Sequence, residues 1–497
     1  MTWALVSLCV LGAIPSGLRW LRVAQREHYL APSTTRFAVR WWSSGAANIV
    51  LSTLASIGVI GSIWSAWWGL LVVGAQVGPV GLSIKGTTSP LAWTRRLVRL
   101  AVTTATLATV VFVAAGITDS PVIAAAGLFL LPVIVDVALL ALKPVERRLG
   151  GRWVDRAAAR LRASGATVVG ITGSYGKTST KQYLAHLIES SRRVVASPAS
   201  YNNRMGLARA VNEQLVPGTE VFVAEMGTYG RGEISDLVSW LHPTVSALVA
   251  IGPVHLERFK TEENIVHAKA EILEGARAAV ISIDHPLLAA LARSRSRDLD
   301  VLTVSTESDE ADVVVRHGYL VIAGEPVARV PDDVFPLNLG VAVALGMQLG
   351  VEPAAMLARI GDLPRAEHRQ NVIVSERGFS IIDDTFNSNP AGARSGLAGL
   401  ARLAESGRKV VVTPGMVELG PMQVRENREF ASLAADVADD VLVVGRINRA
   451  ALLEGASSGK ASVTVVGSRR DAVDWVRQNL GTGDAVLYEN DLPDHYP

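Results

Sequence analysis

The segment from Thr167 to Lys181 constrains the fold more than any other part of the chain. A short run of β-branched residues leads into a turn that holds Gly173 and Gly176, and a helical pattern follows at once. A strand, a glycine turn and a helix N-terminus in this order turn backbone N–H groups toward an anion, and glycine lets the backbone approach it closely. We expect Lys177 to reach the terminal phosphates of a nucleotide and the Thr178 hydroxyl to meet Mg²⁺. The segment predicts a nucleotide-binding α/β domain.

The glycine turn departs from the general pattern G-x-x-x-x-G-K-[ST], because Ile171 occupies the first glycine position. A shorter pattern, [AG]-[IV]-T-G-[ST]-x-G-K-[ST], is met in full by Gly170–Thr178. A lysine followed by threonine at a helix start has no packing purpose, so nucleotide binding is favoured over an ordinary glycine-rich turn.

Charge divides the chain into two parts. Residues 1–150 hold 12 Lys and Arg against 4 Asp and Glu, whereas the remaining 347 hold 36 against 42. Basic charge beside apolar segments indicates the cytoplasmic side of a membrane rather than a nucleic-acid partner. Cys9 is the only cysteine, which excludes an intramolecular disulfide and a cysteine-based metal cluster.

The basic part contains apolar stretches at Trp3–Leu18, Ala46–Ile84, Leu100–Thr118 and Pro121–Leu142. The second has 39 residues without a single charged side chain, while one helix needs only about 20 to cross a bilayer. We therefore expect it to hold two spans, with an interfacial turn near the tryptophans at 64, 67 and 68. This interpretation predicts a transmembrane region over residues 1–150 with about five helices.

The basic residues agree with one orientation of these spans. They follow the first, third and fifth predicted spans, and none occurs near the tryptophans or Asp119. By the positive-inside rule, this predicts an N-out, C-in topology. Asp136 falls inside the last span, where a carboxylate serves either helix packing or transport.

The rest of the chain alternates short apolar runs with helical patterns, which predicts βαβ units and largely parallel sheets. The apolar runs are Val168–Ile171, Arg193–Ala196, Val221–Ala224, Ala247–Ile251, Ala279–Ile283, Val301–Val304, Phe379–Ile382, Lys409–Val412, Asp440–Val444, Ser462–Val466 and Ala485–Tyr488. Short strands are expected over Asp312–Val330 and a helix over Phe335–Leu349. We expect a juxtamembrane connector over 151–164 and α/β domains over 165–350 and 362–497.

Three side chains of the first α/β domain are candidates for metal chemistry. Glu225 ends a buried-type strand, and strand C-termini in a doubly wound sheet face the ligand crevice, so it is expected to meet the metal held by Thr178. His255 follows another apolar strand directly. Lys269, taken alone, reads as a solvated helix lysine.

Several ordered motifs bring these positions together. They are Gly170–Thr178, Tyr201–Asn203, Glu225–Gly227, Gly252–Phe259, Lys269–Ile272, Glu367–Arg369, Ile382–Pro390 and Gly415–Gly420. Over about residues 165–490 the chain resembles the Mur ligases, the ATP-dependent amide-forming enzymes of peptidoglycan precursor synthesis, and most of all their D-alanyl-D-alanine-adding branch. The resemblance implies a P-loop central domain and a Rossmann-like C-terminal domain.

The resemblance also implies roles for individual residues. Lys177, His255, Lys269 and Arg369 are the implied catalytic residues, and Thr178, Glu225, His255 and a carbamylated Lys269 the implied Mg²⁺ ligands. The implied nucleotide- and substrate-binding residues are Gly173, Ser174, Gly176, Lys177, Thr178, Ser179, Asn202, Asn203, Asn338, Arg369, Asp384, Asn387 and Asn389. Carbamylation gives a hard metal the anionic oxygen ligand it requires.

The implied reaction joins an amino acid or a D-Ala-D-Ala-like dipeptide to a carboxylate of a cell-wall precursor, through an acyl phosphate and with release of ADP and phosphate. The implied location is the bacterial inner membrane, with the catalytic domains in the cytoplasm and the bilayer as a partner. A membrane-bound ligase of a poly-γ-glutamate-type polymer and a non-catalytic Mur-like scaffold are the alternatives. The intact lysine, threonine, glutamate and histidine positions argue against the scaffold.

The chain departs from the family in three places. Predicted membrane spans replace the N-terminal domain that binds the UDP-sugar, so the precursor is either lipid-linked or its UDP group is held differently. Tyr488–Pro497 replaces the terminal Lys-Gly-Ser-Arg motif, which leaves either a frayed tail or a site that selects another amine. Val334 and Phe335 stand where a His-Asn pair usually precedes the linker-helix asparagine, here Asn338.

Overall fold

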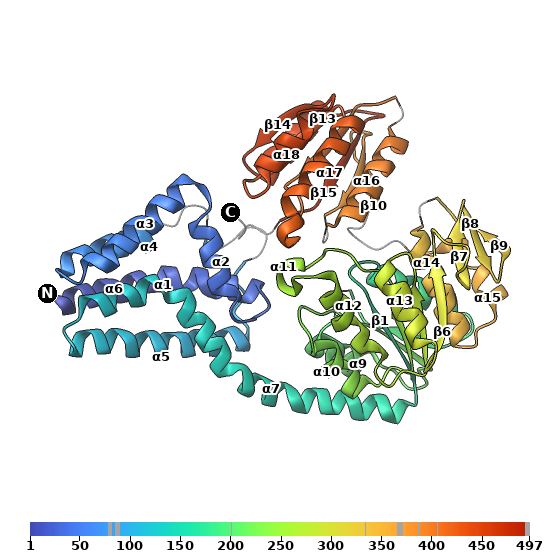
Figure 1. Cartoon of the computed structure of the whole chain (residues 1–497), viewed down its shortest axis with the longest axis horizontal. Coiled ribbons are helices and arrows are strands. Elements are labelled where there is room, and N and C mark those ends of the chain that lie inside the picture. Colours follow the sequence, from blue (N-terminus) through green and yellow to red (C-terminus); the bar gives the residue numbers. More distant parts are fainter. Residues whose placement is uncertain are drawn as a thin grey trace. The chain divides into compact units, whose positions relative to one another are not determined.

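The computed structural model describes residues 1–77, 82–84, 90–199, 201–332, 334–364, 371–385, 388–404 and 406–492. These residues form two compact units (Figure 1). A helical unit is built on Met1–Leu149, and an α/β unit is built on Gly150–Val444 and Asn448–Asp491.

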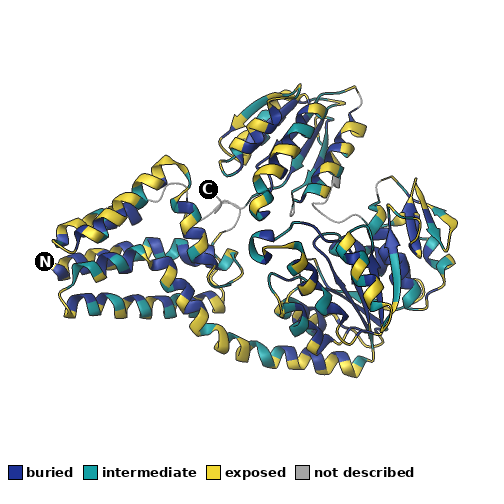
Figure 2. Cartoon of the chain, viewed as in Figure 1, coloured by how far each residue is buried: buried dark blue, intermediate teal, exposed yellow. Residues whose placement is uncertain are grey.

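The helical unit packs apolar helices around a core that contains Cys9, Trp41 and Leu128. Its helices are α1 (Thr2–Arg26), α2 (Ser33–Trp42), α3 (Gly45–Gly61), α4 (Gly69–Val77), α5 (Arg95–Ile117), α6 (Pro121–Phe129) and the first part of α7 (Leu131–Ser164). Figure 2 shows exposed segments along these helices. Many of the exposed side chains are apolar, including Val102 and Val110, which are each 61% exposed. An apolar outer surface of this kind suits a lipid environment better than water.

Within the described residues, α1 and α5 are long and apolar enough to cross a membrane. The pairs α2–α3 and α6–α7 are bent by 109° and 72°, and the number of spans rises to four if each bent pair counts as one. The sequence predicted about five. The difference lies mainly in Ala46–Ile84, where α3 is followed by a turn over the tryptophans and then by α4, of which nine residues are described.

Asp136 holds the N-terminus of α2 in place. Its carboxylate accepts hydrogen bonds from the backbone N–H groups of Thr34, at 3.3 Å, and Thr35, at 2.7 Å, and from the Thr35 hydroxyl at 2.5 Å. The first N–H groups of a helix lack partners within the helix, and a negative charge there is favourable. These contacts favour helix packing over transport as the role of Asp136.

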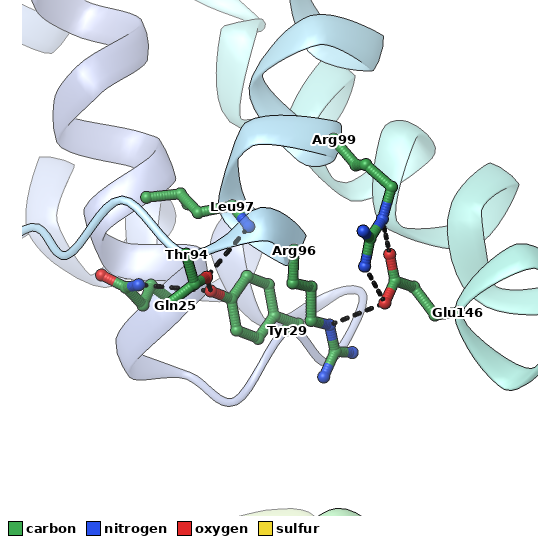
Figure 3. Close-up of polar contacts among 7 residues, drawn as sticks. All are labelled: Gln25, Tyr29, Thr94, Arg96, Leu97, Arg99 and Glu146. Carbon is green, nitrogen blue, oxygen red and sulfur yellow. Dashed lines mark hydrogen bonds and ion pairs between the residues drawn. The ribbon is translucent and has the colours of Figure 1, made fainter. Parts of the chain in front are cut away.

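A polar cluster surrounds the N-terminus of α5 (Figure 3). Arg99 makes a two-pronged contact with Glu146 of α7, with nitrogen–oxygen distances of 2.6 and 2.9 Å. The Arg96 guanidinium lies 4.2 Å from the centre of the Tyr29 ring, and the Thr94 hydroxyl accepts from the Leu97 N–H. The cluster joins the segment after α1 to α5 and α7 through basic side chains at a helix end.

The first part of the α/β unit is a nine-stranded sheet in the order β2-β3-β1-β4-β5-β6-β7-β8-β9. Its strands are β1 (Thr167–Thr172), β2 (Val194–Ala196), β3 (Val221–Glu225), β4 (Val245–Leu248), β5 (Ala278–Ser282), β6 (Asp300–Ser305), β7 (Val313–Arg316), β8 (Tyr319–Ile322) and β9 (Glu325–Arg329). Pairing is parallel from β2 to β7 and antiparallel from β7 to β9.

Helices cover both faces of this sheet because alternate residues of its buried strands point to opposite sides. Val169 and Ile171 of β1 join a core with α8 (Lys177–Ile188) and α14 (Pro336–Gln348), while Val168 joins the core on the other face. That second face is covered by the end of α7 and by α9 (Arg204–Gln214), α10 (Glu233–Leu241), α12 (Glu262–Ala270) and α13 (Pro286–Arg295). The shorter helices are α11 (Leu256–Phe259) and α15 (Pro353–Leu357).

A second, six-stranded sheet follows in the order β10-β11-β15-β12-β13-β14. Its strands are β10 (Asn371–Val374), β11 (Ser380–Asp384), β12 (Lys409–Thr413), β13 (Asp440–Val444), β14 (Ser462–Val466) and β15 (Ala485–Glu489), all parallel except β10. One face packs on α16 (Pro390–Leu403), α17 (Gln423–Val437) and α18 (Arg449–Ala456), and the other on α19 (Arg469–Asn479).

The structure confirms the predicted alternation and adds two features. The edge strand β10 was not predicted, because four residues beside a charged segment carry little pattern. The predicted connector over 151–164 continues the preceding apolar helix, so α7 runs without interruption from Leu131 to Ser164 and through Pro144. The predicted junction over 362–369 lies partly outside the described residues.

Candidate active site

The glycine turn lies where the strand order of the nine-stranded sheet reverses. β1 pairs with β3 on one side and with β4 on the other, and ligands of such sheets bind at the carboxyl ends of the strands beside this reversal. Gly176 has φ +82°, and a Cβ there would lie 2.5 Å from Asn338 Oδ1 and 2.7 Å from Val249 Cγ1. Backbone conformation and space both require glycine at 176.

Two lysines converge on one carbonyl oxygen of this turn. The Lys177 ammonium donates to Gly173 O at 2.8 Å and to Ser174 O at 3.2 Å, and the Lys269 amine lies 3.0 Å from the same Gly173 O. Lys269 is 3% exposed. Burial, together with the positive charge of Lys177, lowers the pKa of Lys269 well below its ordinary value. Lys269 is therefore no solvated lysine but a buried amine beside the nucleotide turn.

Thr178, in the first turn of α8, contacts Glu225 at the end of the adjacent strand β3. The Thr178 hydroxyl donates to Glu225 Oε2 at 3.0 Å, Lys181 Nζ donates to the same oxygen at 3.0 Å, and Asn202 Nδ2 donates to Oε1 at 3.2 Å. Burial opposes the charged form of Glu225, but the positive charges of Lys181 and Lys177 and these hydrogen bonds outweigh it, so the pKa of Glu225 is lowered. The carboxylate is held in its ionised form.

The other predicted nucleotide-side residues lie around the turn. Ser174 N donates to Ala250 O at 2.7 Å and its hydroxyl to Gly252 O at 3.2 Å, which ties the turn to the segment after β4. Ser179 is buried in α8. Asn203 caps α9, because its Oδ1 accepts from Gly206 N at 2.9 Å.

His255 makes a different contact from the one the resemblance implied. It has φ +59°, and its Nδ1 pairs with a carboxylate oxygen of Glu418, which follows β12. Its ring also lies edge-on to Tyr229, with ring centres 4.8 Å apart. No contact with Lys269 or Glu225 is found for His255 among the described residues, so its role as a metal ligand stays a prediction.

The predicted C-terminal residues lie at the carboxyl ends of strands of the second sheet. Asp384 ends β11, and Asn389 caps α16 by accepting from Gly392 N at 3.0 Å. Arg369 and Asn387 lie outside the described residues.

The end of β15 is ordered around Glu489. This carboxyl is fully buried, accepts from the Thr413 hydroxyl at 2.5 Å and pairs with the Ser388 hydroxyl. Burial raises its pKa to about 8, and the nearby charge of Asp384 acts in the same direction. Asp491, just after β15, pairs with Arg469, while residues 493–497 lie outside the described residues, so both interpretations of Tyr488–Pro497 stay predictions.

Sequence reasoning missed Lys181, Glu418 and Glu489 as site-forming residues. Lys181 is three residues beyond Thr178 on a helix, and this spacing places both on the same side of α8. Glu418 lay within a motif already singled out, and its positive φ, +64°, shows only in three dimensions. For Glu489 the sequence showed only a carboxylate at the end of a predicted strand, which does not by itself indicate a site.

The oxygen donors beside the turn fit Mg²⁺. Mg²⁺ in nucleotide sites takes one or two protein oxygens and completes its shell with phosphate oxygens and water. The Thr178 hydroxyl and the Glu225 carboxylate, 3.0 Å apart, supply such oxygens. In the described part of the chain no three His, Cys, Asp or Glu side chains gather as a metal site.

Comparison with known proteins agrees with this geometry. The Mur ligase middle domain matches residues 171–329, and the Mur ligase glutamate ligase domain matches residues 368–488. The UDP-N-acetylmuramoyl-tripeptide–D-alanyl-D-alanine ligase of Mycobacterium tuberculosis is 31% identical over 362 residues, which cover 66% of this chain and 68% of that protein. The chain belongs to the Mur ligase family.

Solved structures of Mur ligases share this fold. The MurF ligase from Thermotoga maritima in complex with ADP has a TM-score of 0.58 and 25% identity, over 69% of this chain and 80% of that one. MurF from Acinetobacter baumannii has a TM-score of 0.60 at 22% identity, over 69% and 77%, which shows the fold alone. The family matches confirm the predicted family and both α/β domains, and they begin only after the helical unit.

Proposed function

We propose that this Mur ligase forms an amide bond between an amino acid or D-Ala-D-Ala-like dipeptide and a carboxylate of a peptidoglycan-type precursor, at the expense of ATP. The observation that carries the proposal is the convergence at one turn of Lys177, Lys269 and the Thr178–Glu225 pair. The relatives that match this chain are named for adding D-alanyl-D-alanine to a UDP-N-acetylmuramoyl-tripeptide, which supports the dipeptide and the precursor.

The reaction has two steps. A carboxylate oxygen of the precursor attacks the γ-phosphorus of ATP, the bond to the β-phosphate oxygen breaks, and ADP leaves. The amine then attacks the carbonyl carbon of the acyl phosphate, phosphate leaves with the bonding electrons, and the amine loses a proton. The first step spreads negative charge over the transferred phosphoryl group, so catalysis requires mainly positioning and positive charge.

Lys177 and the backbone of the turn supply that positive field. In the proposal, the Lys177 ammonium leaves Gly173 O and Ser174 O for the phosphates, because a charged acceptor makes the stronger hydrogen bond. Thr178 and Glu225 would hold Mg²⁺, which would supply positive charge to neutralise the phosphates. Ser174, Ser179, Asn202 and Asn203 line the phosphates or the acyl group, and Asn338 lies against Gly176 on the nucleotide side.

Carbamylation of Lys269 is part of the proposal. An amine must be neutral to take up CO₂, and burial together with the charge of Lys177 lowers the pKa of Lys269, which favours the neutral form. The carbamate then carries negative charge beside the Lys177 ammonium, which attracts it. His255 would hold a second metal with it. Arg369, Asp384, Asn387 and Asn389 complete the nucleotide side from the C-terminal domain.

The helical unit is proposed as a multi-pass anchor in the bacterial inner membrane, oriented N-out and C-in, with both α/β domains in the cytoplasm. Exposed apolar side chains on α1 and α5 and the basic cluster at the start of α5 support this placement. An anchored ligase acts on precursors that are lipid-linked or that reach the membrane surface.

The test is product formation by the full chain purified in detergent, with ATP, Mg²⁺, bicarbonate, UDP-N-acetylmuramoyl-tripeptide and D-Ala-D-Ala, followed by mass spectrometry. We expect a product heavier than the precursor by the dipeptide minus water. Lys177→Ala should lower the rate by about 100-fold or more, as for loss of other donors to developing charge. Lys460→Ala, at an exposed lysine of the C-terminal domain, serves as the matched control. Full activity in Lys177→Ala would overturn the proposal and favour the scaffold.

A further inference from the structure

A buried ion pair lies directly behind the nucleotide turn. Lys181 of α8 and Glu225 of β3 have side chains that are 2% and 3% exposed, with Nζ and Oε2 3.0 Å apart. Removing two charges from water is costly, and well-packed apolar residues in place of such a pair are often equally stable. Stability alone therefore gives no reason for a lysine at position 181.

Lys181 has a second acceptor on another element. Its Nζ donates to Pro198 O at 3.2 Å, and Pro198 belongs to the segment 197–203 between β2 and α9, which is described except for residue 200. The segment contacts the end of β3 at three further places. Glu225 N donates to Ser197 Oγ at 3.1 Å, Asn202 Nδ2 donates to Glu225 Oε1 at 3.2 Å, and Gly227 N donates to Asn202 O at 2.8 Å.

The oxygen that Lys181 contacts is the one that faces the metal ligand Thr178. Glu225 Oε2 accepts from both Thr178 and Lys181, each at 3.0 Å. A divalent cation drawn to this oxygen competes with the Lys181 ammonium, because two positive charges a few ångströms apart repel each other strongly in a buried site. Pro198 O is the acceptor that remains for the ammonium.

We propose that Lys181 is a positioning residue that transmits the state of the nucleotide site to segment 197–203. When Mg²⁺ and nucleotide occupy the turn, the hydrogen bonding of Lys181 moves from Glu225 toward Pro198, and the segment that carries Asn202 and Asn203 is fixed in the form that receives the acyl substrate. This inference rests on the proposed function, in which these asparagines contact phosphate or the acyl group.

The coupling is measured as a ratio of dissociation constants. UDP-N-acetylmuramoyl-tripeptide is titrated calorimetrically into the full chain in detergent, with and without Mg²⁺ and a non-hydrolysable ATP analogue. For the wild type we expect a ratio of about fivefold or more, which is the usual lower end of coupling between sites. In Lys181→Met, which keeps the length of the side chain and removes its charge, the ratio should fall to about one.

Arg204→Met is the matched control. Arg204 begins α9, directly after Asn203, and pairs with Asp236 rather than with Glu225. This variant changes an ion pair at the same segment, so a general loosening of the segment would lower its ratio as well. We expect it to keep the wild-type ratio. A wild-type ratio in Lys181→Met, or a ratio of one in the wild type, would overturn the inference.

A second measurement needs no variant and no acyl substrate. Gly206 N donates to Asn203 Oδ1 and Gly227 N donates to Asn202 O, so exchange of these two amide hydrogens reports on the segment. Mg²⁺ with the ATP analogue should slow both by several-fold in the wild type, and unchanged exchange despite nucleotide binding would refute the relay. Failure of the proposed function looks different, because then no nucleotide binds or no product forms.

Discussion

Glu489→Gln should stabilise the protein at neutral pH. Glu489 is fully buried against the Thr413 and Ser388 hydroxyls, and burial raises its pKa from 4.5 to about 8. The native state therefore holds a proton that the unfolded chain releases. Its contribution to stability is fully present below about pH 4.5 and is lost progressively as the pH rises toward 8.

The magnitude follows from the pH interval. Each pH unit between the unfolded and folded pKa values costs about 1.4 kcal/mol, so the loss at pH 7 is roughly 3 kcal/mol, as an order of magnitude. Glutamine keeps the shape of the protonated acid and both kinds of hydrogen-bonding group, and it cannot ionise. The stabilisation by Glu489→Gln should therefore be near zero at pH 4.5, rise to about 3 kcal/mol at pH 7 and level off above pH 8.

The assay is urea unfolding of the full chain in detergent at a series of pH values, followed by the fluorescence of Trp475, which packs against the core under α19. The fluorescence of the other tryptophans is measured in a Trp475→Phe variant and subtracted, which leaves the signal of Trp475. Glu429→Gln, at an exposed glutamate paired with Arg394, should show no comparable trend. A Glu489→Gln variant that is less stable than the wild type by the same amount at every pH would refute the reasoning.

Three further predictions follow from the described contacts. Gly176→Ala should destabilise the α/β unit by about 1–3 kcal/mol, since alanine at φ +82° is strained and its Cβ meets Asn338, and nucleotide binding measured by calorimetry should be lost. Lys269→Ala should abolish product formation, and short carboxylic acids should restore part of it in a rate assay, whereas rescue by alkylamines instead would count against a carbamate. Asp136→Ala should destabilise the helical unit by about 1–3 kcal/mol in detergent unfolding, because the N–H groups of Thr34 and Thr35 lose their acceptor.

Much of the fold was accessible from local patterns. The turn after β1, the alternation of strands and helices, and the helix over Phe335–Leu349 all depend on residues close together in the chain, where glycine, β-branched runs and helical periodicity act directly. Glu225 was expected to meet the metal held by Thr178 because the ends of parallel strands face the ligand crevice. The two side chains lie 3.0 Å apart, and their role as metal ligands stays a prediction.

Features that depend on residues far apart in the chain could not be predicted from local sequence patterns. The four residues of β10 form a strand only because β11 pairs with them. The bend of 72° between α6 and α7 falls inside Pro121–Leu142, which reads as one straight span in hydropathy alone. The contact of His255 with Glu418 joins residues 163 positions apart, for which the sequence offers no spacing rule.

The amino-acid sequence by itself determined the family, the nucleotide turn and the division into an apolar and an α/β part, because each depends on residue type and short-range spacing. Only the tertiary structure decided the states of the buried charges. In the sequence alone Lys269 resembles a solvated lysine, but in the fold its amine is buried and its pKa is lowered. Nothing in the sequence singled out Lys181, which in the fold pairs with Glu225. Burial inside the sheet raises the pKa of Glu489. Burial and neighbouring charge set these states, and both belong to the folded chain rather than to any segment of it.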